Sequence, residues 1–226
     1  QGQIDISPEY VGSGLGYFDK AAPTGDGETN RTALAAKLAD KKISVFGISP
    51  GEDTNAAVVR KDTADQYGLT TMSDLAAVQD QLTWGLPPEC DARPLCKGAL
   101  EAYGITYPPK QREALAACDA PIATALENKG IDFGWLCSTQ PAIAQFGFVA
   151  LEDDKNTQPA ENMTALVRDD LLAKVGDKAA FQGLLDGVLA KLTTEELTRM
   201  GVEVAVDQKD VADVAKAFLT ANGLIK

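Results

Sequence analysis

Few residues of this chain have the types and spacing that catalysis needs. Histidine is absent, so the commonest general base and activator of a serine or cysteine nucleophile is missing. No G-x-S-x-G motif marks a serine nucleophile either. The adjacent carboxylates Asp153-Asp154 and Asp169-Asp170 lie in polar turns or at helix starts, where solvation or capping accounts for them. The sequence therefore predicts a protein that is not an enzyme and that uses no cofactor.

Three glycines near the N-terminus, Gly12, Gly14 and Gly16, resemble the start of a phosphate-binding loop. Tyr17 stands where the last glycine of G-x-G-x-x-G belongs, and no Gly-Lys-Ser/Thr follows. Nucleotide binding is therefore disfavoured. Nucleic acid is disfavoured as a partner too, because 21 Lys and Arg against 33 Asp and Glu give a net charge of −12 without a basic cluster.

The four cysteines occur with the spacings Cys90-x5-Cys96 and Cys118-x18-Cys137. Neither spacing matches a zinc ribbon or a thioredoxin-type pair, and without histidine a metal site is disfavoured. An even count favours two disulfides in an oxidising, extracytoplasmic compartment, with four free thiols as the open alternative. No apolar run is long enough to span a bilayer and no signal peptide is visible, while the missing initial Met suggests a processed or truncated chain.

The elements that must position these residues alternate between apolar strands and helices, which predicts an α/β class with mainly parallel sheets. Strands are predicted at 4–6, 43–48, 56–59, 82–85, 131–136, 148–151 and 163–167, with a strand-like or extended segment at 202–206. Helices are predicted at 32–40, 61–67, 74–78, 94–103, 120–128, 168–175, 177–191, 194–200 and 210–222, whereas 111–117 is helical or coil.

Two polar segments connect strands without a helix between them. The acidic, proline-containing passage 152–162 leaves one strand and enters the next, which is typical of a crossing between two lobes. The turn-rich segment 49–55 is the second predicted crossing. A chain that crosses twice predicts two lobes with a ligand cleft between them.

The chain resembles, over nearly its whole length, the substrate-binding proteins of osmoprotectant ABC importers, of the glycine betaine, choline and proline-betaine type. The resemblance rests on four segments in order: IDISPEYVGSGL, SPGEDTNAAVVRKDTADQYGLTTMSDLA, PPECDARPLCKGALEAYGI and ALENKGIDFGWLCSTQPAIAQFGFVALEDDKNTQPAENMTALVRDDLL. It implies a two-lobed type II periplasmic binding fold, in which the solute binds between the lobes and closure buries it.

The same resemblance implies how the lobes divide the chain. Residues 1–55 and 161–226 are expected to form lobe one and residues 56–160 lobe two, with hinges near 53–58 and 156–163. Family members begin with a strand, a helix and a second strand before the segment that matches IDISPEY. We therefore expect part of lobe one to be absent from this chain, which would leave an unpaired sheet edge.

Solute contacts are implied by the family's aromatic cage, which holds quaternary ammonium against the faces of its rings. Tyr10 matches a cage tyrosine, with packing inside lobe one as its alternative role. Asn55, Cys137 and Glu161 fall at or near positions where other members have aromatic rings. With Asn162, the Asn55 and Glu161 side chains offer hydrogen bonds instead, which favours a cation carrying N–H groups or a polyhydroxylated solute. A solvated hinge position is the alternative for Glu161.

Ser13, Asp119 and Thr139 are further predicted contacts, because each lies at a strand or helix end on the side of the cleft. Asp119 precedes a predicted helix, so capping that helix is its alternative role.

Disulfides between Cys90 and Cys96 and between Cys118 and Cys137 are also implied, and they would stiffen lobe two while the crossings flex. The predicted function is the solute-binding component of an ABC importer, which delivers a small quaternary ammonium or polar solute to membrane permease subunits. The predicted location is periplasmic or extracytoplasmic, with a lipid anchor as an option in a full-length protein. The open alternatives are a scaffold that binds a polyol, an aromatic compound or a peptide, a sensory domain, and an enzyme.

Overall fold

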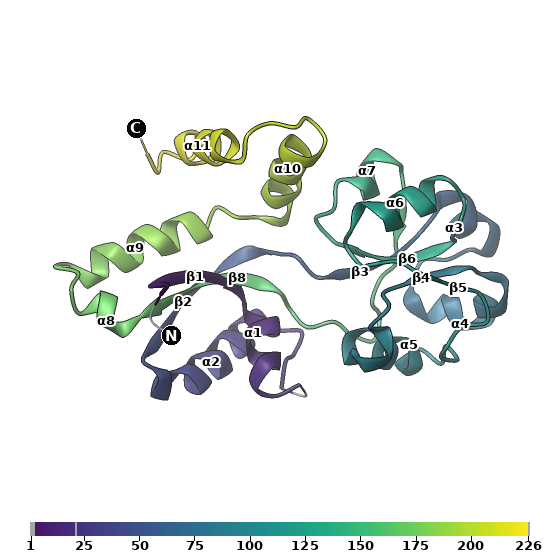
Figure 1. The fold of residues 1–226 in the computed structure, drawn as a ribbon, viewed down its shortest axis with the longest axis horizontal. Coiled ribbons are helices and arrows are strands. Elements are labelled where there is room, and N and C mark those ends of the chain that lie inside the picture. Colours follow the sequence, from purple (N-terminus) through teal and green to yellow (C-terminus); the bar gives the residue numbers. More distant parts are fainter. Residues whose placement is uncertain (1–2, 21, 226) are drawn as a thin grey trace. The chain divides into compact units, whose positions relative to one another are not determined.

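The computed structural model describes residues 3–20 and 22–225, which fall into two compact units (Figure 1). Unit 1 comprises residues 1–53 and 159–226, and unit 2 comprises residues 54–158. The lobe limits predicted from the sequence lie after residues 55 and 160, and the assignment of the units to the family's lobes stays a prediction. Within the described ranges, no helix is long and apolar enough to cross a membrane.

Unit 1 is built on a three-stranded antiparallel sheet in the order β1-β8-β2. These strands span Ile6–Tyr10, Asn162–Arg168 and Ile43–Glu52, respectively. The helices are α1 (Val11–Phe18), α2 (Gly27–Leu38), α8 (Asp169–Leu172), α9 (Lys178–Leu189), α10 (Thr194–Ala205) and α11 (Val211–Ala221). In Figure 1, α1 and α2 lie on one face of this sheet and α9 on the other.

Side-chain alternation along the strands explains the two helical layers of unit 1. On β8, Leu166 packs with the buried leucines of α1 and α2, at positions 15, 34 and 38. Its neighbours Ala165 and Val167 point the other way and pack with Leu189 of α9 and Phe218 of α11. A single central strand therefore contributes to both cores of unit 1.

Two segments of unit 1 differ from the sequence-based prediction. Residues 11–18 lie outside the helices and strands predicted from the sequence, yet they form helix α1. Residues 202–206 were expected to be strand-like, but helix α10 continues through them to Ala205. Arg199 on α10 pairs with both Glu196 and Glu203, one turn before and one turn after it, and this supports the longer helix.

Unit 2 contains a five-stranded mixed sheet in the order β5-β4-β6-β3-β7. These strands span Arg112–Ala114, Trp84–Leu86, Phe133–Cys137, Asn55–Val59 and Val149–Ala150, respectively. The helices are α3 (Lys61–Tyr67), α4 (Leu75–Val78), α5 (Ala99–Ala102), α6 (Ala120–Glu127) and α7 (Ala142–Gln145). Trp84, Phe133 and Trp135 pack on one face of the sheet, and Val58 and Leu136 pack with α6 on the other.

The α/β class is correct, but the prediction of mainly parallel sheets is wrong. Among the strands of the described residues, β4 is parallel to β5 and β6, whereas β3 and β8 are antiparallel to their partners. The reason is that parallel neighbours need a crossover connection within one sheet. β3 and β8 are the first strands that the chain forms after it passes from one unit to the other, so no crossover helix precedes either of them within its own sheet. The first crossing is also shorter than predicted, because β2 continues to Glu52 and β3 begins at Asn55.

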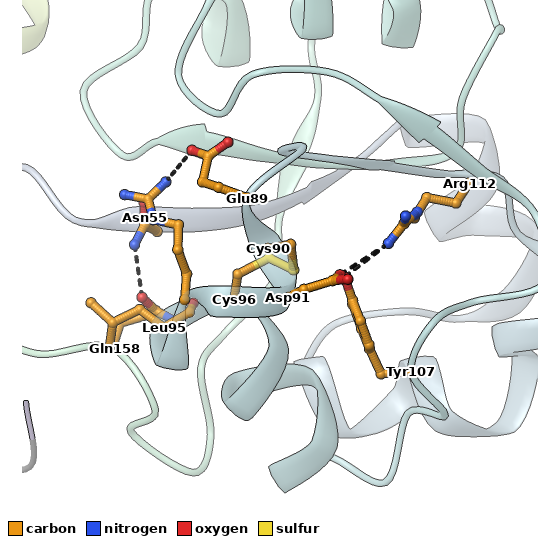
Figure 2. The surroundings of a disulfide bond; sticks show 10 residues. Asn55, Glu89, Cys90, Asp91, Leu95, Cys96, Tyr107, Arg112 and Gln158 are labelled. Carbon is orange, nitrogen blue, oxygen red and sulfur yellow. Dashed lines mark hydrogen bonds and ion pairs between the residues drawn. A yellow bond between two sulfur atoms is a disulfide. The ribbon is translucent and has the colours of Figure 1, made fainter.

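The cysteines are paired as the family resemblance implied, Cys90 with Cys96 and Cys118 with Cys137. The first disulfide closes the loop between β4 and α5, and Figure 2 shows its surroundings. Asp91 within this loop accepts a hydrogen bond from the Tyr107 hydroxyl, and that oxygen also accepts from Arg112 at 2.8 Å. The loop is therefore held to unit 2 by side chains as well as by the disulfide.

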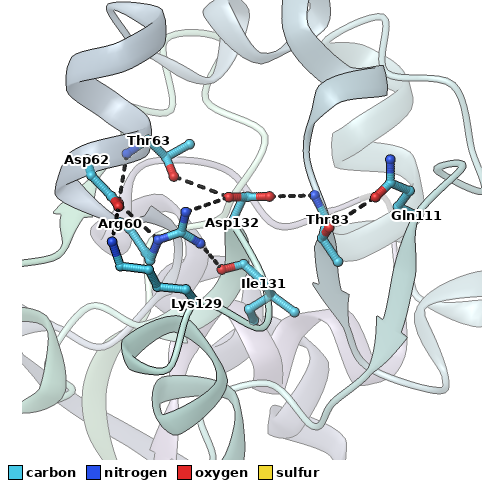
Figure 3. Close-up of polar contacts among 8 residues, drawn as sticks. All are labelled: Arg60, Asp62, Thr63, Thr83, Gln111, Lys129, Ile131 and Asp132. Atoms are coloured by element: carbon cyan, nitrogen blue, oxygen red, sulfur yellow. Dashed lines mark hydrogen bonds and ion pairs between the residues drawn. The ribbon is translucent and has the colours of Figure 1, made fainter.

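A polar cluster joins the starts of three elements of unit 2 (Figure 3). Arg60 and Asp132 form an ion pair at 2.7 Å, and their side chains are 15% and 22% exposed. Asp132 also accepts hydrogen bonds from the backbone N–H of Thr83 at 2.8 Å and from the Thr63 hydroxyl at 3.3 Å. Arg60 donates to the carbonyl oxygen of Ile131. These contacts fix the end of β3 and the starts of α3, β4 and β6 relative to one another.

At the edge of this cluster, the Asp62 carboxylate contacts two cationic side chains. Its carboxylate accepts from Lys129 at 2.8 Å and from Arg60 at 2.9 Å. The hydrogen bond from Lys129, assisted by Arg60, lowers the pKa of Asp62 to about 2. Asp62 therefore stays ionised throughout the physiological range.

Candidate functional site

In unit 1 the structure brings together three of the predicted contact residues, Tyr10, Ser13 and Glu161. The Glu161 carboxylate accepts from the backbone N–H of Ser13 at 2.9 Å and from its hydroxyl at 2.8 Å. The Tyr10 hydroxyl donates to Asp53 at 3.1 Å. Asp53 donates its backbone N–H to the carbonyl oxygen of Glu161 at 3.2 Å. The two segments of chain at the edge of unit 1 are thus linked to each other and to the start of α1.

The Glu161 side chain reaches the N-terminus of α1 from another part of the chain, and its carboxylate lies where backbone N–H groups lack partners within the helix. Its side chain is 7% exposed, so the carboxylate is desolvated. Burial raises the pKa of Glu161, and the hydrogen bonds from Ser13 and the backbone of Gly12 oppose this. A helix N-terminus favours a negative group, which explains how a buried carboxylate is tolerated here.

Gly12 is required by this close approach. A Cβ atom at Gly12 would lie 2.7 Å from the carbonyl oxygen of Ala160 and 2.9 Å from the carboxylate of Glu161. The glycine-rich start of α1 therefore lets the returning chain pass close to the helix. It does not form a phosphate loop.

Replacing Glu161 with Gln should change how stability depends on pH. A raised pKa means that folded Glu161 binds more protons than unfolded Glu161 at pH values above the ordinary 4.5. Its contribution to stability is therefore largest at low pH and falls as the pH rises through the folded pKa. Because the glutamine side chain of the variant cannot ionise, the free energy of unfolding of the wild type minus that of Glu161→Gln should decrease from pH 4 to pH 7. Urea denaturation at four pH values measures this difference, and a constant or rising difference would contradict it.

Tyr10 is half-buried, and its hydroxyl is used within unit 1. Burial, with the neighbouring charge of Asp53, raises the pKa of Tyr10 to about 12. The phenol therefore remains neutral and donates to the Asp53 carboxylate. The ring face is the part of Tyr10 that can contact a cation.

Asn162 follows Glu161 directly and its side chain makes separate contacts. Its amide nitrogen donates to the carbonyl oxygen of Ser49 at 3.1 Å. Asn162 also lines an open pocket of unit 1 between the start of α2 and the end of β2, with Asp26, Glu28 and Glu52 around it. Asn162 thus contributes to the junction of β2 and β8 and not to the group around Glu161.

In unit 2 the predicted contact residues each have a different structural role. Asn55 donates its side-chain N–H to Gln158 at 2.9 Å, which joins the two ends of the chain segment that forms the unit. Thr139 is half-buried in the turn after β6. Asp119 is exposed and accepts a hydrogen bond from the N–H of Ala120 at 2.8 Å. It therefore caps α6, which is the alternative role given for it above. The Cys137 sulfur is bonded to Cys118.

Three residues near the predicted contacts, Asp53, Arg93 and Trp135, have no sequence pattern that marks them as candidate site residues. Asp53, the partner of Tyr10, lies in a turn-rich segment where an aspartate is ordinary. Arg93 and Trp135 line a second cavity, in unit 2. The apolar neighbours of Trp135 predict a buried strand and give no further sign of a role in a site. Within the described ranges, no group of three His, Cys, Asp or Glu side chains could hold a metal ion.

Comparison with known proteins gives the family. Residues 1–221 match OpuAC, the substrate binding domain of ABC-type glycine betaine transport system. The chain belongs to this family. The substrate-binding domain is 26% identical to the glycine betaine-binding protein YehZ of Escherichia coli, over 100% of this chain and 76% of that protein. It is 29% identical to the carnitine transport binding protein OpuCC of Listeria monocytogenes, over 75% of this chain and 54% of that protein.

A solved structure gives the same result for the fold of this substrate-binding domain. A crystal structure of a glycine betaine/carnitine/choline ABC transporter protein matches with a TM-score of 0.81 and 26% identity, over 99% of this chain and 80% of that chain. The predicted type II periplasmic binding fold and the predicted role as a solute-binding component of an ABC transporter are confirmed. Substrate-binding proteins of ABC importers bind small solutes outside the cytoplasm and work with permease subunits.

Proposed function

We propose that this substrate-binding domain binds a small osmoprotectant of the betaine class and delivers it to the permease subunits of one ABC importer. It performs no catalysis in this role. The observation that supports the proposal most is the family match over residues 1–221. Glycine betaine and carnitine are the solutes named for the two relatives compared above, and both are therefore the first candidates here.

The proposed solute contacts in unit 1 are Tyr10, Ser13 and Glu161, with Asn162 beside them in sequence. The half-buried Tyr10 ring supplies a face for a cation, and the buried Glu161 carboxylate adds negative potential next to it. In unit 2 the proposed contacts are Asn55, Asp119 and Thr139. Cys137 is a disulfide cysteine, so this cage position supplies no ring.

Isothermal titration calorimetry tests the proposal directly. Glycine betaine, carnitine, choline and proline betaine are titrated into the folded protein, with a polyol such as sorbitol as the comparison. We expect at least one of the quaternary ammonium solutes to bind with a Kd well below millimolar. If only the polyol binds, the scaffold serves another class of solute. If none binds to protein with an intact unfolding transition, the osmoprotectant function is wrong.

Replacing Tyr10 with Ala should weaken binding of the best solute at least tenfold, or about 1.4 kcal/mol, because the variant removes the ring face. The matched variant Tyr10→Phe keeps the ring and loses only the hydrogen bond to Asp53. It should therefore bind within a few-fold of the wild type. Calorimetry on both variants measures the effect. Equal affinity for Tyr10→Ala and the wild type would remove Tyr10 from the site.

A further inference from the structure

The indole nitrogen of Trp135 is a buried donor without an acceptor. Trp135 is 2% exposed, and its Nε1 has no hydrogen-bond partner among residues 3–20 and 22–225. The chain's other tryptophan, Trp84, is equally buried and donates its Nε1–H to the carbonyl oxygen of Gln79 at 3.0 Å. Buried indole N–H groups normally find a partner. Trp135 is therefore set up to donate to an atom that is not part of the chain.

The cavity beside Trp135 has the size of a single group. Its polar lining comes from Trp135, Arg93 and Asn55, and its apolar walls include Leu95, Cys96 and Ala117. The volume of the cavity is about 10 Å³, which is close to the volume that one water molecule needs. The cavity thus accepts one oxygen atom of a ligand, and the remainder of a solute would stay outside it.

The loop that carries Arg93 is held in place on both sides. The Arg93 N–H donates to the carbonyl oxygen of Cys90 at 3.1 Å, and its own carbonyl accepts from Cys96 at 3.0 Å. The Cys90–Cys96 disulfide closes the loop around these bonds (Figure 2). The neighbouring Leu95 carbonyl accepts from Gln158 at 3.0 Å. The loop that forms this wall of the cavity is therefore held in one conformation by hydrogen bonds and a disulfide.

The donors at the cavity favour an anionic oxygen. One N–H of the Asn55 amide donates to Gln158, and the other is left for a solute. Arg93 pairs with Glu89 at 3.0 Å, but both side chains are at least half exposed, and such pairs are weak. A guanidinium has five N–H donors, and one carboxylate leaves several of them for another acceptor. An indole N–H and a guanidinium together suit a carboxylate oxygen.

We infer that the Trp135 indole N–H and the Arg93 guanidinium form a subsite for one carboxylate oxygen of the solute. This inference rests on the proposed function and makes it more specific. Glycine betaine and carnitine carry a carboxylate that the subsite can bind, whereas choline ends in a neutral hydroxyl. The subsite therefore selects zwitterionic betaines over choline.

Indole resonances of ¹⁵N-labelled protein test the subsite without relying on transport. The two tryptophans give two signals, and Trp135→Phe identifies the one that it removes. Glycine betaine, acetate and choline are then titrated. We expect the Trp135 signal to shift saturably with the two carboxylates and not with choline, while the Trp84 signal stays in place.

Affinity gives the second measurement. Trp135→Phe and Arg93→Gln should each weaken glycine betaine binding about tenfold and leave choline binding within two-fold. Arg199→Gln is the matched arginine control, since the partly exposed Arg199 pairs with glutamates of its own helix α10 in unit 1 and does not line the cavity, and it should leave both affinities unchanged. Arg93 is half exposed, so Arg93→Gln decides the question even if Trp135→Phe fails to fold.

The outcomes separate the two proposals. If choline binds but neither carboxylate moves the Trp135 signal, the cavity holds only water and the inference is wrong, while the solute-binding function stands. If no betaine or choline binds, the proposed function is wrong. Acetate still decides the subsite in that case, because a saturable shift of the Trp135 signal supports it and an unchanged signal overturns it.

Discussion

Replacing Asp132 with Ala is expected to destabilise unit 2 by about 2–4 kcal/mol, because it removes the more buried of the two carboxylates that pair with the largely buried Arg60 guanidinium and leaves only the half-exposed Asp62. The backbone N–H of Thr83 also loses its acceptor, at a further cost. Both tryptophans of the chain lie in unit 2, so tryptophan fluorescence during urea denaturation reports the unfolding of this unit.

The matched control for this prediction is Asp65→Ala. Asp65 pairs with Lys61 at 2.8 Å, but their side chains are 64% and 68% exposed. Removing an exposed pair should change the free energy of unfolding by less than about 1 kcal/mol. The double variant of Arg60→Ala and Asp132→Ala should cost less than the sum of the two single variants. A cost for Asp132→Ala no larger than that for Asp65→Ala would show that the cluster contributes little to stability.

Replacing Gly51 with Ala should destabilise unit 1 by about 1–3 kcal/mol, as other over-packed sites do. A Cβ atom there would lie 2.4 Å from the nitrogen of Thr194 and 2.6 Å from the carbonyl oxygen of Leu192. Both are backbone atoms, so no side chain can rotate away. The end of β2 would have to move, which strains the bonds from Gly51 to Leu192 at 2.9 Å and from Glu52 to Thr194 at 3.1 Å.

Far-UV circular dichroism, combined with amide hydrogen exchange at residues 51 and 52, measures this effect. Gly183→Ala is the control, because Gly183 lies within helix α9 and a Cβ there meets nothing within 4 Å. It should stabilise the protein by roughly 0.5–1 kcal/mol. Opposite signs for two identical substitutions are the expected result, and equal effects would contradict the packing at Gly51. Since the first segment of unit 1 ends at Asp53, the contacts of Gly51 anchor the chain just before the first crossing.

Local patterns in the sequence predicted many elements of the fold. Helix α3 spans the predicted residues 61–67, and α10 begins at the predicted residue 194, where Thr193 caps it through the N–H of Glu196. These features depend on residues close in sequence. Strand β5 was missed because its three residues are all exposed and have no apolar period.

Helix α1 and its contact with Glu161 could not be predicted in this way. Glycines have poor helix propensity, so the segment 11–18 looked irregular. The helix gains a carboxylate at its N-terminus from a residue 148 positions away. No local rule contains that contact. The same holds for Trp135, whose apolar neighbours predicted a buried strand without indicating that its N–H would lack an acceptor.

The family resemblance predicted which residues to consider, and the structure shows that their roles are mixed. Ser13 and Glu161 hold each other, and Asp119 caps a helix. A side chain with such a structural role can still contact a solute. Its residue type must then suit both the fold and the solute.

The central position of β8 has a consequence for the order in which the chain folds during synthesis. β1 and β2 pair with β8 and not with each other, yet β8 is synthesised only after the whole of unit 2. At ~5–20 residues per second, the first 53 residues wait on the order of ten seconds for their partner strand. Unit 2, a single continuous segment, can complete its core in that interval. The N-terminal residues therefore belong to the part of the protein that folds last.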